Sequence, residues 1–386
     1  MTKLSRNGSG SGSGRRPRAR GRGAAAVALL GAATLLLAAC SSGSAAPAEQ
    51  ERDYGTPAAG KIKEGILEGT TLTYAGPGGI FQEGQDKAIW QPMAKESGAT
   101  MQMDAFDAGK LKAMVDSKNV TWDIVDTSQV DSARGCGTLY EKIDRSKIDT
   151  SKLPEGTLTD ECMIPNVMYG FVIAYNKDKF GDNPPKSAAD FFDTKKFPGK
   201  RTVPATTYVD PQNMEFPLMA DGVDLDNLKP EHIDQAIKKY KSLGKDGIVW
   251  TTGAQAQQQL ESGEAVMGFV WSGRGYGAAD AGAPIAPVWD EWLVAIDSTA
   301  IPKGAKDKGA SEAAINYFLG ADQQAKMTEL NSMSPVNVDA KPQVDDTLSE
   351  WLASSRFETG RVPDIDFWVK NYDAMAAAWA TWVTGA

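Results

Sequence analysis

One segment, Ala265–Asp297, constrains the fold more than any other part of the chain. It begins with an apolar run, Val266–Trp271, which has the length and bulk of a buried strand. An Ala-rich segment typical of a helix follows and ends near Gly282. Two further apolar runs, Ala283–Val288 and Leu293–Ile296, indicate strands. This alternation of short apolar runs and helical segments predicts an α/β fold built on an open, mainly parallel sheet.

Three side chains at the ends of these runs suggest a binding site. Trp271 ends the first run, Arg274 follows three residues later, and Asp297 closes the last run. Open parallel sheets bind ligands just beyond the carboxyl ends of their strands. An arginine can hold a carboxylate with two hydrogen bonds, an aspartate can hold an ammonium group, and a Trp face can line the chain between them. We therefore expect a cleft for a small ligand that carries at least one amine.

The first 39 residues have the pattern of an export signal. A basic region rich in Arg precedes the apolar segment 24–39, which is too short to span a membrane. The segment leads into Leu37-Ala38-Ala39-Cys40, which resembles a bacterial lipobox. The resemblance implies that Cys40 is acylated and anchors the protein to the outer face of the cytoplasmic membrane. We expect residues 1–39 to be the signal peptide and residues 40–69 to be a flexible tether, since Ser, Ala, Pro and Gly dominate its first part.

The charge of the chain argues against nucleic acid as a partner. The formal charge is −9, but the leader holds seven of the 41 Lys and Arg residues and none of the 50 Asp and Glu residues. The mature chain therefore has 34 basic and 50 acidic residues, a formal charge of −16. Such a chain suits an exported protein and a cationic ligand.

The cysteine and histidine content limits the possible chemistry. Besides Cys40, only Cys136 and Cys162 remain, and in an oxidising compartment a disulfide is the first interpretation, with two buried free thiols as the alternative. That bond would close a loop of about 26 residues and contribute about 3–4 kcal/mol in the loop-entropy model. The only histidine, His232, lies on a predicted helix, and no cluster of residues has metal-ligand spacing. We expect no metal, no cofactor and no catalytic site.

Residues next to other predicted strands complete the set of candidates, and Tyr169 among them lies at the entrance of an apolar run, Val172–Tyr175, expected to cross between the lobes. These candidates are Gly78, Thr127, Ser128, Tyr169 and Thr252. Gly78 lies in a Gly-rich turn after the strand Thr71–Ala75, where the backbone could approach a ligand or could only form a tight turn. Asp126, Thr127 and Ser128 precede one predicted helix and Thr252 precedes another, so each could cap a helix, contact a ligand, or do both.

Several segments together resemble a known family. They are WDIVDTSQVDSARGCGTLYEKID, AYNKDKFG, KKFPGKR, SGEAVMGFVWSGRGYGAADAGAP and IPKGAKDKGASEAAINYFL, and the match runs from about Thr71 to Asn337. The chain is similar here to the spermidine/putrescine-binding proteins of ABC importers. The resemblance implies a two-lobed, type II-like periplasmic-binding-protein fold with hinge crossovers, which closes on a ligand held in a cleft between the lobes. It also implies a membrane permease and its ATPase as partners.

The resemblance suggests a division of the mature chain. We expect residues 70–171 and 297–345 to form lobe 1, residues 172–296 to form lobe 2, and the whole protein to be a monomer. Residues 346–386 should form a C-terminal helical segment packed on the lobes. The residues Trp368, Tyr372, Met375, Trp379 and Trp382 recur at helical spacing and indicate one packing face of a helix.

The resemblance assigns roles to some candidates and leaves the ligand open. Asp297 corresponds to the family aspartate that receives an amine, Trp271 to the Trp of the cleft, and Thr127 and Ser128 to a serine-rich turn. The family's further acidic pair has no clear match around Asp210–Met214.

Arg274 also departs from the polyamine pattern, because a polyamine site should not contain a cation. Family branches that take linear amino acids such as γ-aminobutyrate pair an arginine with an aspartate. The alternative role for Arg274 is an ion pair with Asp297 or with a surface carboxylate. Polyamine and ω-amino acid therefore both remain open as ligands. A lipid-anchored sensor or adhesin is the alternative function without transport.

Overall fold

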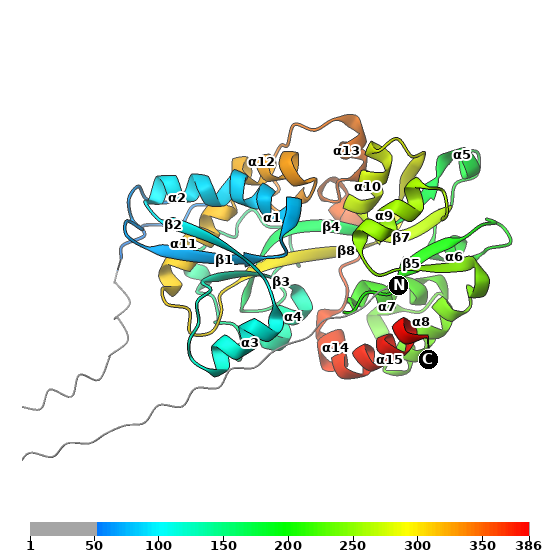
Figure 1. The fold of residues 1–386 in the computed structure, drawn as a ribbon, viewed down its shortest axis with the longest axis horizontal. Helices are drawn as coiled ribbons and strands as arrows, with labels where there is room; N and C mark the ends of the chain where they lie inside the picture. Colours follow the sequence, from blue (N-terminus) through cyan, green and yellow to red (C-terminus); the bar gives the residue numbers. More distant parts are fainter. Residues whose placement is uncertain (1–51, 386) are drawn as a thin grey trace, which may run out of the picture. The chain divides into compact units, whose positions relative to one another are not determined.

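The structure is a computed structural model, and it describes residues 52–385. The predicted signal peptide and Cys40 lie outside the described residues. The described chain is a mixed α/β protein that contains one nine-stranded sheet. Its strands belong to two groups, which are called lobe 1 and lobe 2 below (Figure 1).

Lobe 1 is built on three parallel strands from the first part of the chain. These are β1 (Thr71–Gly76), β2 (Thr100–Ala105) and β3 (Ile124–Ser128). Its helices are α1 (Gly79–Gln85), α2 (Gln91–Ser97), α3 (Ala108–Asp116), α4 (Gln129–Gly135), α11 (Lys308–Phe318) and α12 (Ala321–Asn331). A short π-helical segment, η1 (Asp86–Trp90), joins α1 to α2, so that one continuous helical run follows the Gly-rich turn. The N-terminal strand therefore lies where the sequence predicted it.

Lobe 2 has the same construction. Its parallel strands are β5 (Arg201–Pro204), β6 (Gly247–Trp250) and β7 (Met267–Trp271). Its helices are α5 (Lys177–Phe180), α6 (Ala188–Phe192), α7 (Pro211–Ala220), α8 (Glu231–Lys241), α9 (Gly253–Glu261) and α10 (Ser272–Asp280). Most buried aromatic side chains of this lobe belong to one core cluster, in which Phe216 stacks on Phe269 with ring centroids 3.7 Å apart.

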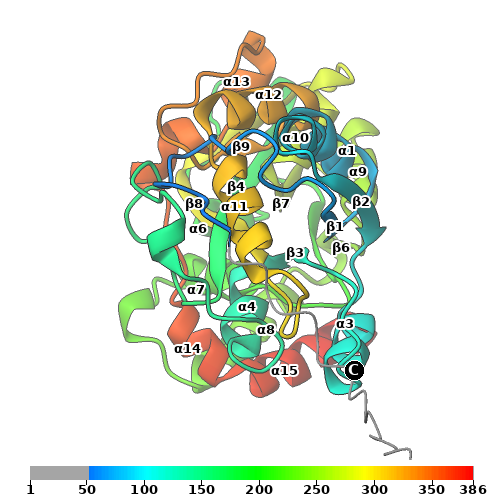
Figure 2. The ribbon, with the colours of Figure 1, turned by 90° about the vertical axis from the view of Figure 1, so that its left-hand side faces the viewer.

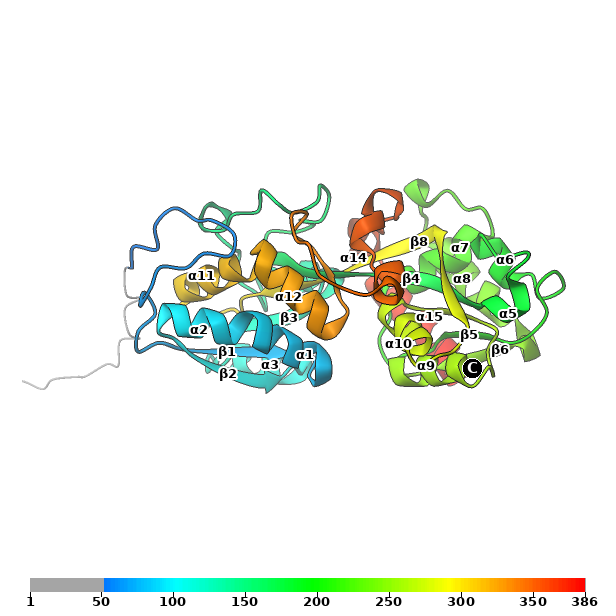
Figure 3. The same ribbon diagram turned by 90° about the horizontal axis from the view of Figure 1, so that it is seen from above.

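Two long antiparallel strands connect the lobes. These are β4 (Met163–Asn176) and β8 (Ile285–Ala300), and Figure 3 shows both passing from one lobe to the other. A short strand, β9 (Ser334–Pro335), also pairs with β4. The strand order is β2-β1-β3-β8-β4-β7-β5-β6, with β9 beside β4. Each half of the long strands therefore completes the sheet of one lobe.

The two strands expected at Ala283–Val288 and Leu293–Ile296 are one strand, β8. Its pairing with β4 shifts between Val288 and Leu293, which face Ile173 and Phe171. The polar residues that interrupt the apolar pattern lie within this irregularity. The separation into two strands was wrong because pairing with β4 resumes on both sides of the interruption.

The C-terminal segment packs on lobe 2 but is not one continuous helix. It contains α13 (Asp346–Trp351), α14 (Ile365–Lys370) and α15 (Tyr372–Thr384). Helical geometry is lost at Asn371, which has φ −107° and ψ 16° and separates Trp368 from the other four residues of the predicted face. Trp368, Met375 and Trp379 are buried in the core of lobe 2.

Part of the expected tether is held against lobe 1 (Figure 2). The amide of Gly60 donates to the carbonyl of Asn316 in α11 at 3.0 Å, and the Asn316 side chain donates to the carbonyl of Ala58 at 2.8 Å. Leu67 is fully buried in the core. The expectation of a flexible tether up to residue 69 is therefore wrong for its second part, because residues 58–67 attach to lobe 1.

A disulfide joins Cys136 and Cys162, which confirms the predicted pairing. Cys136 directly follows α4 and Cys162 directly precedes β4. The bond therefore ties the helix that begins at the end of β3 to the start of a crossing strand.

Candidate functional site

The strand register brings the carboxyl ends of strands from both lobes to the middle of β4. Ser128, the last residue of β3, pairs with Asp297 of β8, and Asp297 also pairs with Val167 of β4. Trp271, the last residue of β7, pairs with Phe171, four residues further along β4. The predicted candidates Ser128, Asp297 and Trp271 are thereby grouped around one short stretch of the crossing strands.

Asp297 is half-buried and is held by one of the other candidates. The hydroxyl group of Tyr169 donates a hydrogen bond to Asp297 Oδ1 at 3.3 Å. Burial and the charge of Asp297 raise the pKa of Tyr169, so this phenol keeps its proton and remains a donor. The two residues were selected from distant parts of the sequence, and β4 and β8 bring them together.

A second carboxylate, Asp126, lies on the same face of the sheet. Side chains alternate between the two faces of a strand, so Asp126 and Ser128 of β3 share one face and Thr127 lies on the other. Ser128 pairs with Asp297, which places Asp126 and Asp297 on the same face. Asn166 Nδ2 lies 2.6 Å from Asp126 Oδ2, and the Tyr74 hydroxyl lies 3.1 Å from it. Burial raises the pKa of Asp126 to about 6, although these hydrogen bonds favour its ionised form.

A third carboxylate, Asp210, reaches the site from lobe 2. It occupies the N-cap position of α7, after the loop that follows β5. Burial, together with the charge of Asp131, raises the pKa of Asp210 to about 7. Burial also raises the pKa of Asp297 well above its ordinary value, and the charges of Asp126 and Asp210 raise it further. Asp210 thus acts electrostatically on Asp297, although the sequence showed no clear acidic match in this loop.

The three carboxylates lack a cation. Among residues 52–385, no Lys, Arg or His nitrogen lies within 4.0 Å of Asp126, Asp210 or Asp297. Removing a charge from water is costly unless an opposite charge replaces the lost hydration. The cluster is therefore electrically incomplete, and a bound ammonium group would complete it.

Arg274 lies in the first turn of α10, beside Trp271 and the first residue of α9. A Cβ atom on Gly253 would come within 2.5 Å of Arg274 Nε and 2.8 Å of Trp271 Cζ3, so only glycine fits there without displacing these side chains. Within the described part of the chain, Arg274 has no carboxylate within 4.0 Å. The alternative role, an ion pair with Asp297 or a surface carboxylate, is therefore absent from this structure.

Trp271 offers a ring face and an unused donor. Its ring packs edge-on against Trp250, with centroids 5.1 Å apart, and against Phe171, with centroids 6.2 Å apart. Its indole N–H is buried and has no acceptor among residues 52–385. Buried donors are almost always paired, so this N–H is available to a ligand acceptor.

The remaining candidates have structural roles of their own. Ser128 caps α4 by accepting from Asp131 N at 3.1 Å, and Thr252 caps α9 by accepting from Gln255 N at 3.2 Å. Thr127 points to the face opposite Asp297, where its hydroxyl lies 3.3 Å from that of Tyr140. Gly78 has φ 80° and precedes α1. Ligand contact by any of these residues stays a prediction.

The sequence offered Asp126, with Thr127 and Ser128, as a helix cap or a ligand contact, but it singled out neither Asp210 nor Gly253 as a site residue. Asp210 could have been noticed because it precedes Pro211, a common arrangement at the start of a helix. Gly253 follows the Thr252 cap, but its contact with Arg274 depends on how α9 and α10 pack together. No local signal predicts that contact.

Comparisons with known proteins agree with this architecture. A family model described as bacterial extracellular solute-binding protein matches residues 88–355. The γ-aminobutyric acid-binding protein of Pseudomonas aeruginosa is 29% identical over 324 residues, which cover 81% of this chain and 90% of that protein. The spermidine/putrescine-binding periplasmic protein of Escherichia coli is 26% identical over 269 residues, which cover 66% and 75% of the two chains.

Solved structures show the same relationship. A GABA receptor structure is 36% identical, has a TM-score of 0.74, and matches over 81% of this chain and 98% of its own. The PBP MotA from A. tumefaciens B6, in complex with glucopine, is 31% identical with a TM-score of 0.70, over 81% of this chain and 100% of its own. With its two lobes, crossing strands and matched residues 88–355, this chain belongs to the family of bacterial extracellular solute-binding proteins.

Proposed function

We propose that this protein captures a linear ω-amino acid, such as γ-aminobutyrate, and delivers it to the permease of an ABC importer. The family and the relatives named for γ-aminobutyrate and polyamines support capture of a small amine-bearing solute. The choice of ligand rests on two charged sites, one negative and one positive, that each lack an opposite charge among the described residues. Asp297 lies in an acidic cluster without a cation, and Arg274 lies beside Trp271 without an anion.

The geometry suggests how such a ligand would be held. Its ammonium group would replace the missing cation beside Asp297, with Asp126 and Asp210 adding negative potential. Its methylene chain would lie along Trp271. Its carboxylate would accept from Arg274 and from the unpaired indole N–H of Trp271. Closure of the two lobes around β4 and β8 would then exclude water and strengthen each of these contacts.

A polyamine is the second candidate, and one specific observation favours it. Three carboxylates could serve more than one ammonium group, whereas an ω-amino acid has only one. Arg274 argues against a polyamine because its fixed charge would repel the second ammonium group.

Isothermal titration calorimetry with γ-aminobutyrate, putrescine and spermidine tests both candidates. Asp297→Asn should weaken the binding of every amine by about 2–5 kcal/mol, since a charged contact loses its partner. Arg274→Ala should abolish the binding of γ-aminobutyrate, because the ligand carboxylate would be buried without a partner. The same variant should leave a polyamine unaffected or bound more tightly.

Two exposed positions provide controls for the changes in charge. Asp178→Asn and Lys238→Ala alter exposed residues of α5 and α8 and should bind ligand as the wild type does. If Asp297→Asn also binds like the wild type, the assigned site is wrong. If Arg274→Ala keeps γ-aminobutyrate and loses putrescine, the choice between the two ligand classes is reversed.

We also propose that Cys40 carries the lipid anchor. The support is the Leu37-Ala38-Ala39-Cys40 motif, and no helix among the described residues is long and apolar enough to cross a bilayer. Cys40→Ser should release the protein from the membrane fraction of cells, and retention of the variant there would refute the anchor. Loss of labelled ligand uptake in cells that lack the protein would separate transport from a sensor or adhesin role.

A further inference from the structure

The C-terminal helix α15 holds the strand end that leads to Asp210. Trp382 Nε1 donates to the carbonyl of Pro204 at 2.8 Å, and Trp379 Nε1 donates to the carbonyl of Thr206 at 2.9 Å. Pro204 ends β5, and Thr206 begins the loop before Asp210. Two indole groups from the end of the chain therefore fix the backbone on the N-terminal side of this carboxylate.

The same segment also fixes the backbone on the other side of Asp210. Glu215 in α7 is fully buried and accepts from Trp368 Nε1 at 2.8 Å and from Arg361 Nε at 3.1 Å. Its carboxylate also accepts from the amide of Asp364 at 3.2 Å. Because α7 begins directly after Asp210, both the loop and the helix that flank this residue are attached to the C-terminal segment.

A further contact of this segment crosses to lobe 1. The guanidinium carbon of Arg134, in α4, lies 3.4 Å from the centroid of the Tyr372 ring, which is a close cation–π contact. Arg134 is also oriented by Asp131, whose Oδ1 atom lies 3.2 Å from Arg134 Nη1. The helix α4 begins at the Ser128 cap, which faces Asp297 in the sheet. The contact therefore connects the C-terminal segment, which holds the backbone around Asp210 in lobe 2, to α4, which lies beside Asp297 in lobe 1.

We propose that α14 and α15 form a brace between the lobes, and that the Tyr372–Arg134 contact raises ligand affinity by keeping Asp210 close to Asp297. Tyr372, Trp379 and Trp382 are positioning residues in this view, since they act through Asp210. The inference rests on the proposed function for its effect on affinity. Without the contact, β4, β8 and β9 would hold the lobes with more freedom, and part of the binding free energy would be spent on ordering them.

A double-mutant cycle on Tyr372 and Arg134 tests the brace. Tyr372→Ala and Arg134→Ala should each weaken the binding of γ-aminobutyrate, or of putrescine if that is the ligand, by about 2- to 30-fold. The double variant should be no weaker than the weaker single variant, because both changes remove one contact. Tyr372→Phe keeps the ring face and should bind nearly as the wild type does. A contact with a purely structural role would lower the melting temperature of the empty protein and leave the affinity unchanged.

A distance measurement without ligand separates this inference from the proposed function. Spin labels at Lys87→Cys in lobe 1 and Lys238→Cys in lobe 2, both exposed positions, report the distance between the lobes. Tyr372→Ala should broaden the distance distribution in the empty protein, and an unchanged distribution would overturn the brace. A broadened distribution with unchanged affinity would overturn its role in binding. If the wild type binds none of these amines while the distribution still broadens, the proposed function fails and the brace remains.

Discussion

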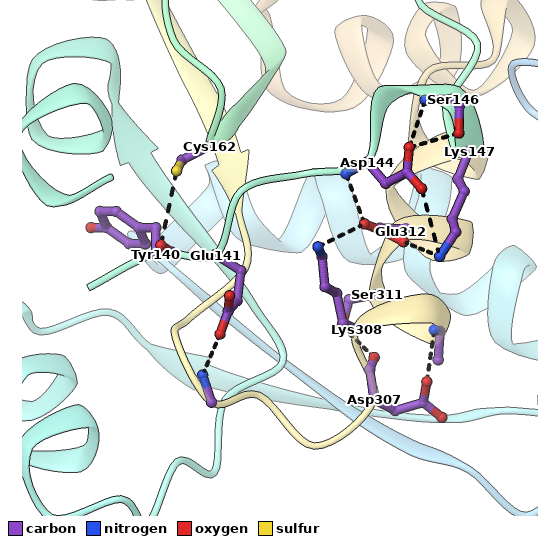
Figure 4. Close-up of polar contacts among 12 residues, drawn as sticks. Tyr140, Glu141, Asp144, Ser146, Lys147, Cys162, Asp307, Lys308, Ser311 and Glu312 are labelled. Carbon is purple, nitrogen blue, oxygen red and sulfur yellow. Dashed lines mark hydrogen bonds and ion pairs between the residues drawn. The ribbon is translucent and has the colours of Figure 1, made fainter. Parts of the chain in front are cut away.

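Buried carboxylates in two regions of this molecule have opposite surroundings. In lobe 1, the Glu312 side chain is 1% exposed and lies 3.3 Å from Lys147 Nζ and 3.5 Å from Lys308 Nζ (Figure 4). It also accepts from the amide of Asp144 at 2.9 Å. The cluster of Asp126, Asp210 and Asp297 has no such cation within the described residues.

In the proposed function, this difference distinguishes a carboxylate that stabilises the fold from one that binds the ligand. Glu312 and Glu215 are paired with cations inside the fold, Glu312 with Lys147 and Lys308 and Glu215 with Arg361. Burial still raises the pKa of Glu215, and its hydrogen bonds and the charge of Arg361 oppose that shift. Asp126, Asp210 and Asp297 regain only part of the interactions that they lose with water, so their ionised forms destabilise the empty protein. A site prepared for a cationic ligand has this imbalance, because the ligand supplies the missing charge.

Removing a compensated carboxylate should cause the largest change in stability. Glu215→Ala would leave the buried indole N–H of Trp368 and the Nε–H of Arg361 without their acceptor, although Arg361 Nη1 would keep its contact with Asp226. We expect a loss of about 3–5 kcal/mol in the free energy of unfolding, measured by urea denaturation. Glu215→Gln is the matched control, since it keeps an acceptor and should lose less. If Glu215→Ala were as stable as the wild type, the Glu215 carboxylate would not contribute to the stability of the fold.

Replacing a buried carboxylate with its amide should change the stability of the empty protein in opposite directions in the two regions. Asp210→Asn removes an uncompensated charge and should stabilise the empty protein by about 1–2 kcal/mol, whereas Glu312→Gln should destabilise it by a similar amount. Asp210→Asn should also weaken amine binding, so stability and binding trade against each other. Thermal unfolding of both variants without ligand measures the signs. Destabilisation by Asp210→Asn would remove the distinction between the regions.

The smallest expected effect is a dependence of amine binding on pH. The pKa values of about 6 for Asp126 and about 7 for Asp210 lie above the ordinary value of 3.8, so the empty folded protein holds protons that the unfolded chain has lost. The contribution of these groups to stability therefore falls as pH rises from about 4 to about 7. A bound ammonium group favours the ionised carboxylates, so binding should release protons and strengthen about 5- to 10-fold between pH 6 and pH 8.

Calorimetry in buffers with different ionisation enthalpies measures those protons directly. Asp210→Asn should release fewer of them than the wild type. Affinity that is constant over this pH interval, without proton release, would mean that the cluster is ionised before the ligand arrives.

Local patterns were sufficient to locate most elements and three central candidates. Trp271 and Arg274 could be selected because the end of β7 is visible as the end of an apolar run. Asp297 was expected at a strand end as well, but it lies inside β8, which continues to Ala300. Tyr169 was selected at the entrance of an apolar run expected to cross between the lobes, and it lies inside the crossing strand β4. The Cys136–Cys162 bond followed from the small number of cysteines. The long β8 was predicted less well, because only its pairing with β4 shows that the polar interruption lies within one strand.

The sequence by itself determined the fold class, the end of β7 at Trp271 and the disulfide, since each depends on residue type, spacing or count along the chain. Only the tertiary structure decided which carboxylates lie around Asp297. Asp126 arrives through the β3–β8 register, and Asp210 arrives through the attachment of α7 to the C-terminal segment. It also decided that Thr127 faces away and that Arg274 has no carboxylate partner among residues 52–385. Electrostatic pairing depends on distances between residues far apart in sequence, and those distances are fixed only when the strands pair and the helices pack.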